Sequence, residues 1–324
     1  MTSSSEGDGL CSQSSALVFG AFTVASYMVS SSMLIAACAL VLMSRKVFHV
    51  FFSALFTLAL AFYVVCNALN VASSILLFLD HYSPTLYKAL DIAYQGAYVY
   101  TTCNIACCVL ERTCATVLMD SYEYRRPWFA LLLSQIFCAV IAYIHIYVYT
   151  NNSGSGASDL ILFILAILII ASLTILLLIN RKLILSFRGG RRSLSTRYQL
   201  TENVRALRLA VPVVVLDTLV TSADLIASNF FDIAVEFEPK KCSTHAHYLL
   251  FYIVFRLASV AFELCIPVAI VRHESLSKVL SAYCHKREVH LGKEKRAVTI
   301  TNVLGMNIQG GNDDHFGQLR QQWS

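Results

Sequence analysis

Seven long apolar stretches, separated by short segments that hold most of the charged residues, constrain the fold of this chain more than any other feature. A helix that crosses a bilayer needs about 20 mostly apolar residues. The stretches cover roughly residues 16–43, 47–79, 92–110, 128–149, 160–179, 207–230 and 248–271. They predict an all-α membrane protein built as a seven-transmembrane helix bundle. The sixth helix is expected to begin inside the preceding basic segment, at about 196.

The composition excludes most classes of soluble protein. Hydrophobic residues make up 57% of the chain and charged residues 14%, against roughly 45–50% and about 25% in soluble domains. We do not expect an enzyme, because the sequence contains no convincing nucleophile–base set, metal cluster or glycine-rich phosphate loop. No catalytic residue, metal or cofactor is therefore predicted. Basic residues in short loops between spans favour membrane orientation over nucleic-acid binding.

The distribution of lysine and arginine predicts an N-terminus outside and a C-terminus inside. In that orientation 21 of the 25 basic residues lie in inner segments, and only Lys88, Lys240 and Lys241 lie in outer ones. Inner segments of membrane proteins carry such an excess of Lys and Arg. The sequon Asn151-Asn152-Ser153 falls in a predicted outer loop, which makes Asn151 a glycosylation candidate.

Four regions follow along the chain. They are an extracellular N-terminal tail (1–15), the seven-transmembrane domain (16–271), an interfacial amphipathic helix (272–285) and a disordered cytoplasmic tail (286–324). In the third region, Leu276, Val279, Leu280 and Tyr283 fall at helical spacing, which is typical of a helix lying along the membrane surface. Cys284 at its end is a palmitoylation candidate, with an unmodified tail cysteine as the alternative.

Two inner-side motifs resemble a known family. The third span ends in Glu-Arg-Thr-Cys-Ala-Thr (111–116), followed by Ser-Tyr-Glu (121–123), and residues 194–203 read Leu-Ser-Thr-Arg-Tyr-Gln-Leu-Thr-Glu-Asn. Together they resemble the nematode serpentine chemosensory receptors of the alpha, ab, beta and epsilon group, class epsilon first and class ab next. Where the family has Asp-Tyr-Glu, this chain has one additional residue, Ser121, between Asp120 and Tyr122. With the seven spans, the resemblance extends over about 16–285.

The resemblance implies a G-protein-coupled olfactory or gustatory receptor. Its partners would be a heterotrimeric G protein, a small-molecule ligand and the lipid bilayer. Its location would be the plasma membrane, in the cilium of a sensory neuron. A membrane transporter or channel for ions or protons, using the acids of spans six and seven, is the alternative. We find no internal repeat and no paired broken helices of the kind that transporters have.

The inner end of the third span is the predicted G-protein site. An acid beside a base, Glu111 and Arg112, can hold the guanidinium until the receptor opens. Once released, the guanidinium offers five donors to the carbonyls of a G-protein helix. Arg197, Tyr198 and Gln199 are expected to contribute to the same contact. The alternative roles are attraction to anionic lipid for the basic loop and an interfacial position at the headgroups for Arg112.

Charged residues within spans six and seven mark a second candidate site, because such residues are costly in a bilayer. Asp217 and Asp224 lie seven residues apart, as do Arg256 and Glu263. Depth along the helices predicts an ion pair between Arg256 and one of the two aspartates. The surplus of acids leaves open a site for a proton, a sodium ion or a cationic ligand group.

The ligand pocket is expected in the outer half of the bundle. Tyr94, Tyr98 and Thr101 share one face of the third span, where aromatic walls with few polar groups suit a small ligand. Together with Asp217, Asp224 and Arg256 they are the pocket candidates. Interfacial anchoring of the tyrosines is the alternative.

Two cysteines lie in predicted outer segments, Cys11 in the tail and Cys242 in the last outer loop. The outside is oxidising, so these two are candidates for a disulfide.

Overall fold

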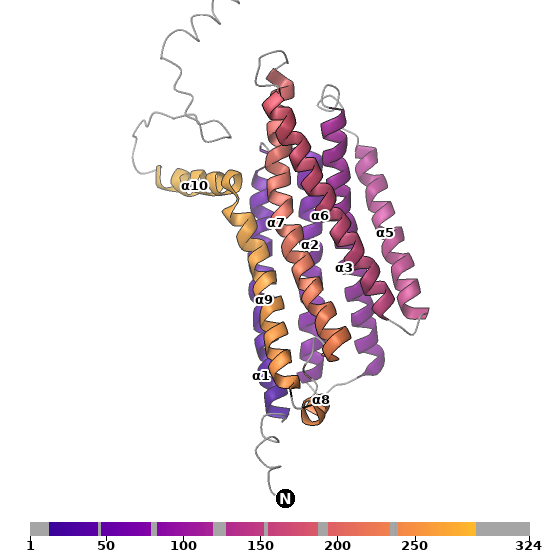
Figure 1. The fold of residues 1–324 in the computed structure, drawn as a ribbon. Helices are drawn as coiled ribbons and strands as arrows, with labels where there is room; N and C mark the ends of the chain where they lie inside the picture. The colour runs from indigo at the N-terminus through magenta and orange to yellow at the C-terminus, as the bar shows by residue number, and fades with distance from the viewer. Residues whose placement is uncertain are drawn as a thin grey trace, which may run out of the picture. The chain divides into compact units, whose positions relative to one another are not determined.

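The structure is a computed structural model of the full chain. It describes residues 13–44, 47–78, 83–118, 128–151, 155–186, 194–233, 237, 239–245 and 247–289. Regular secondary structure within these ranges is entirely helical (Figure 1). The predicted all-α class is therefore confirmed.

Seven helices in the described ranges have 24 residues or more. They are α1 (Gln13–Met43), α2 (Val50–Phe78), α3 (Pro84–Val117), α5 (Trp128–Asn151), α6 (Ser155–Ser186), α7 (Leu194–Phe231) and α9 (Tyr248–Arg272). Two shorter helices are α8 (Pro239–Thr244) and α10 (Glu274–Val289). The long helices match the seven predicted apolar stretches in order. α10 runs four residues beyond the predicted end of the interfacial helix at 285.

By length and composition, six of the long helices are suited to cross a membrane: α1, α2, α5, α6, α7 and α9. α3 is long enough but more polar, because it contains threonines, an asparagine and charged residues near both ends. Its position explains this polarity, because α3 contacts α2, α5, α6 and α7 at once. Polar side chains on a helix surrounded by protein can find partners there, which a lipid-facing helix cannot offer. That α3 is a seventh span stays a prediction.

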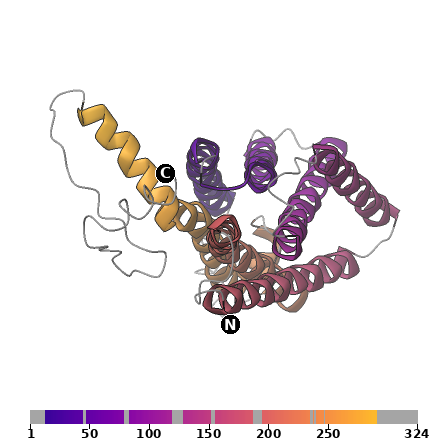
Figure 2. The same ribbon diagram turned by 90° about the horizontal axis from the view of Figure 1, so that it is seen from above.

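The long helices form a closed ring of contacts with α3 toward its interior (Figure 2). Neighbours in sequence pack against each other, and the contact between α1 and α9 closes the ring. The core between them is apolar and includes Phe52, Leu60, Val99, Leu207 and Ile270, each 1% exposed or less.

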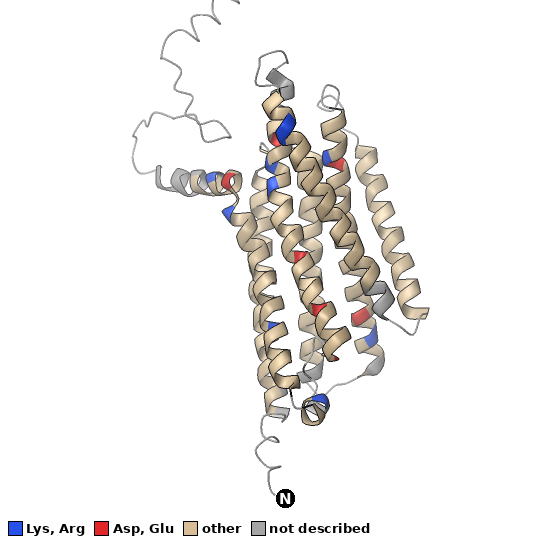
Figure 3. Ribbon diagram, in the orientation of Figure 1, with Lys and Arg blue, Asp and Glu red and all other residues tan. Residues whose placement is uncertain are grey.

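The outer surface of the bundle is apolar. On α5, only Cys138 and Ala142 are buried, whereas Phe129, Tyr143 and Tyr147 are each more than 60% exposed. Charged residues are sparse along the long helices, and α7 carries acidic residues between its uncharged ones (Figure 3). Soluble monomers rarely expose apolar surface on this scale, so these faces are suited to contact lipid.

The starts of α3 and α7 can be compared with the local sequence. α3 has Pro84 in its first turn and Ser83 before it in an extended conformation, as expected because proline is pre-organised for the start of a helix. α7 begins at Leu194 and continues to Phe231 without a break at Pro212. The prediction that the sixth span extends into the preceding basic segment is therefore confirmed.

Candidate functional site

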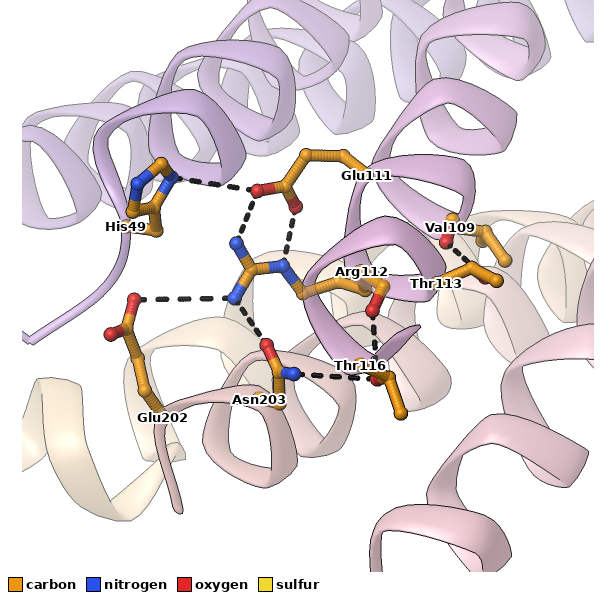
Figure 4. A network of polar contacts seen from close by, with 8 residues as sticks. All are labelled: His49, Val109, Glu111, Arg112, Thr113, Thr116, Glu202 and Asn203. Carbon is orange, nitrogen blue, oxygen red and sulfur yellow. Dashed lines mark hydrogen bonds and ion pairs between the residues drawn. The ribbon is translucent and has the colours of Figure 1, made fainter. Parts of the chain in front are cut away.

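A buried polar cluster lies where α3 ends and α7 begins, and we call it the Arg112 network (Figure 4). Its members are His49, Glu111, Arg112, Thr116, Asn180, Glu202 and Asn203. Arg112 is 1% exposed, the largest side chain that is fully buried among the described residues. Its Nε and Nη2 donate to the two carboxylate oxygens of Glu111, and its Nη1 donates to Asn203 Oδ1 at 2.8 Å.

Three further groups surround this ion pair. Glu202 Oε1 lies 4.0 Å from Arg112 Nη1, and His49 Nδ1 lies 3.5 Å from Glu111 Oε1. The ring centroid of Phe52 lies 5.2 Å from Arg112 Cζ, within cation–π range. A buried guanidinium needs such compensation, because removing one partner of a buried pair costs about 3–5 kcal/mol.

The network extends from α3 to α6 through amide and hydroxyl groups. Thr116 Oγ1 donates to Arg112 O at 2.9 Å. It accepts hydrogen bonds from Asn180 Nδ2 at 3.0 Å and from Asn203 Nδ2 at 3.3 Å. Asn180 is fully buried, and its Nδ2 also lies 2.8 Å from Leu176 O. The network therefore joins α3, α6 and α7 at the predicted inner end of the bundle.

The residues predicted for G-protein coupling are only partly brought together. Glu111 and Arg112 form an ion pair at the centre of the network. Gln199 is half-buried on α7, whereas the side chains of Arg197 and Tyr198 lie outside the described residues. Sequence reasoning missed His49 and Asn180. A single amide at the end of an apolar stretch was the signal for Asn180, because such a group needs a buried partner.

A second feature is an internal cavity of about 40 Å³ between α1, α2, α3, α7 and α9, which we call the central cavity. Its lining residues lie around the middle of their helices, except Tyr94 and Tyr98, which lie in the first half of α3. The polar residues that line it are Ser30, Tyr63, Asn67, Asn70, Tyr94, Tyr98, Asp217 and Glu263.

Three of the six predicted pocket residues line this cavity: Tyr94, Tyr98 and Asp217. The Tyr98 hydroxyl is also hydrogen-bonded to Thr221 Oγ1 on α7 at 2.5 Å. Thr101 lies elsewhere, 1% exposed, with its hydroxyl donating to Ala97 O at 3.0 Å within α3. Asp224 and Arg256 are likewise not among the lining residues.

The predicted ion pair between Arg256 and Asp217 or Asp224 does not form, since no such pair within 4.0 Å occurs in the described ranges. Arg256 Nη2 instead donates to the Tyr27 hydroxyl of α1 at 2.9 Å. Asp224 accepts a hydrogen bond from Ser259 Oγ at 2.8 Å. The rotation of α9 about its own axis explains this. α9 packs against both α1 and α7, and its rotation turns Arg256 toward α1 and Ser259 toward α7.

The residues of the three predicted modification sites lie in three different helices or outside the described residues. Cys242 is disulfide-bonded, while Cys11 lies outside the described residues. Asn151 is the exposed last residue of α5. Cys284 lies within α10, but its side chain is outside the described part of the chain.

Comparison with known proteins identifies one family. The family model described as "Sre G protein-coupled chemoreceptor" matches residues 85–324, from the first turn of α3 to the end of the chain. A comparison with curated proteins finds no match. The resemblance drawn from the two inner-side motifs is confirmed, because both motifs lie within the matched region. Since that region covers well over half of its length, this chain belongs to the Sre family of G protein-coupled chemoreceptors.

Proposed function

We propose that this protein binds a small-molecule cue in the outer half of the helix bundle and activates a heterotrimeric G protein at the end that carries the Arg112 network. The family match supports a chemosensory receptor. The excess of Lys and Arg supports placing this end in the cytoplasm, with the N-terminus outside. The central cavity would form the floor of the ligand pocket.

The observation that carries the coupling proposal is the burial of Arg112 between groups of different helices. Asn203 and Glu202 approach it from α7, and Thr116 links its backbone to Asn180 of α6. These contacts hold α3, α6 and α7 together in the state described here. A ligand that binds better to a second arrangement would shift the population toward it. Separation of α7 from α3 would then break the Arg112–Asn203 hydrogen bond.

The released guanidinium would be suited to the G protein. It is always charged and presents five donors in a fixed plane. The last carbonyls of a partner helix lack intrahelical donors and carry partial negative charge. Arg112 would donate to these carbonyls, and Arg197, Tyr198 and Gln199 near the start of α7 would add contacts at the rim.

Two substitutions with opposite expected effects test this proposal. Glu111→Gln removes the charge that holds Arg112, so basal nucleotide exchange on the G protein should rise by about fivefold or more. Arg112→Ala removes the donor itself, so exchange should fall to the level of membranes without receptor. Thr113→Ala is the matched control, because Thr113 lies beside Arg112 and donates only to Val109 O within α3 (Figure 4).

The measurement is GTP-analogue binding to purified G protein on membranes with equal amounts of receptor at the cell surface. Wild-type exchange in the Arg112→Ala receptor would contradict the proposal. So would an equal change in the Thr113→Ala receptor.

The family match favours a receptor over the alternative, a transporter or channel. Ion flux in liposomes that disappears in the Asp217→Asn protein would replace the receptor proposal.

We also propose four features of the mature protein. They are glycosylation at Asn151, a Cys11–Cys242 disulfide, palmitoylation at Cys284 and an interfacial position for α10 at the plasma membrane of a sensory cilium. The disulfide proposal is supported by the bonded state of Cys242, since eight other cysteines are free.

A further inference from the structure

The central cavity contains two acidic residues and no basic one. Asp217 of α7 and Glu263 of α9 both line it, and none of its lining residues is Lys, Arg or His. Within the described ranges, neither carboxylate has a basic group within 4.0 Å. Asp217 is 6% exposed. An ionised carboxylate that is buried without a cation is costly, so a bound cation would stabilise the ionised form of these residues.

Two charged residues near the cavity, Arg256 and Asp224, have hydrogen-bond partners that do not line it. Arg256 lies on α9, seven residues before Glu263, but its Nη2 donates to Tyr27. Asp224 on α7 accepts from Ser259. Arg256 is close enough to act on the charge of Glu263. Neither Arg256 nor Asp224 lines the cavity, however, so a cation inside it would meet the two carboxylates with no basic side chain among the lining residues.

The remaining walls suit an organic cation. Tyr63, Tyr94 and Tyr98 line one part, and the Tyr94 and Tyr98 rings are nearly parallel, with centroids 6.3 Å apart. Aromatic faces attract ammonium groups, more strongly when water is excluded. Leu34, Val220 and Ile266 supply apolar surface, which an alkyl group fills and a bare metal ion does not.

The size of the cavity limits the ligand. A water molecule needs roughly 10–15 Å³ of such volume, and the cavity has about 40 Å³. This is room for a group of a few non-hydrogen atoms.

We propose that the central cavity binds a small alkylammonium ion, with its charged head between Asp217 and Glu263 and its alkyl part against the tyrosines. The proposal names the ligand class of the receptor and rests on the proposed function only for its signalling consequence. The binding itself requires only the folded bundle.

The test is thermal unfolding of the purified receptor in detergent, without G protein. The probes are n-propylammonium chloride, 1-propanol as a neutral molecule of equal size, and sodium chloride at equal ionic strength. Propylammonium should raise Tm with increasing concentration beyond the sodium chloride reference, and 1-propanol should not. Asp217→Asn and Glu263→Gln should each weaken the apparent affinity about tenfold or more.

Asp224→Asn is the matched control, because it removes an acid of the same helix that does not line the cavity. It should leave the affinity for propylammonium within about twofold of wild type. Val220→Leu covers the case in which an acid variant does not fold. It adds one methylene to the cavity wall without changing charge, and it should weaken binding of propylammonium.

Three results would overturn the proposal: no propylammonium-specific rise in Tm for the folded wild type, an equal rise with sodium chloride or 1-propanol, or an equal loss of affinity in Asp224→Asn. The readout involves no G protein. Retained binding without nucleotide exchange would therefore contradict the proposed function alone, and exchange without binding would contradict this inference alone.

Discussion

Asn180 illustrates how single polar residues specify the packing of this bundle. Its side chain is fully buried, and its amide nitrogen lies within hydrogen-bond distance of both Thr116 of α3 and Leu176 O of its own helix. A buried amide tolerates few other environments, because an unsatisfied polar group in an apolar interior costs about 1–3 kcal/mol. Asn180 therefore favours one rotation of α6 against α3.

We predict that Asn180→Ala lowers the free energy of unfolding by about 1–3 kcal/mol. The substitution removes the amide and leaves Thr116 with one partner fewer. Thermal unfolding of the purified receptor measures the effect as a lower Tm. The control is Thr174→Ala on the same helix, where the hydroxyl is exposed and donates only to Ile170 O within α6. A Tm for Asn180→Ala as high as that of Thr174→Ala would refute this role.

At the scale of elements, all of the long helices except α2 are longer than the apolar stretches that predicted them. The third stretch, 92–110, lies within α3 (Pro84–Val117), and 160–179 lies within α6 (Ser155–Ser186). The first charged residue after an apolar run marks the limit of the hydrocarbon region, whereas the helix continues as long as its backbone hydrogen bonds do. The sequence therefore predicted the order of the elements better than their ends.

The attachment of α5 depends on a close approach to α3 at Gly96. A Cβ atom at this position would lie 2.7 Å from Ile146 Cδ1 on α5. Small residues allow helices in membranes to approach closely. This matters for α5 because few of its residues are buried and most of its contacts with other helices are to α3.

We predict that Gly96→Leu lowers the free energy of unfolding by about 1–3 kcal/mol through overpacking. Gly96→Ala should change it by less than about 1 kcal/mol, because the Ile146 methyl can move and alanine favours helix. Differential scanning fluorimetry compares the variants. Adding Ile146→Ala to Gly96→Leu should restore part of the loss, since it removes the colliding atoms. If Ile146→Ala restores none of the lost free energy of unfolding, the contact between residues 96 and 146 is not the cause of the destabilisation.

At the scale of the whole molecule, the number of spans depends on α3. By length and composition, six of the seven long helices are suited to cross a membrane, and α3 is the long helix that does not meet these criteria. The position of α3, in contact with four other long helices, accounts for its polar composition, because the buried polar side chains of α3 are paired with groups of the protein. Seven spans place the two termini on opposite sides of the membrane, and six place them on the same side.

We predict that an epitope at the N-terminus is stained on intact cells and one at the C-terminus only after permeabilisation. Both termini on the same side would show that α3 does not cross. An N-terminus inside would reverse the orientation deduced from the 21 basic residues. Glycosidase treatment should shift the wild-type protein but not the Asn151→Gln control, because the loop after α5 is then outside.

The sequence by itself determined the all-α membrane class, the order of the long helices and the family. The bilayer requires long apolar helices, and the two motifs lie within the matched region. The tertiary structure decided which polar groups meet. Spacing and depth gave Arg256 two acidic candidates, yet it bonds to Tyr27, while Asp217 shares a cavity with Glu263. The average apolarity of a helix depends only on its own residues. Which polar groups meet depends on the rotation and tilt of each helix, and the packing of all neighbouring helices sets these.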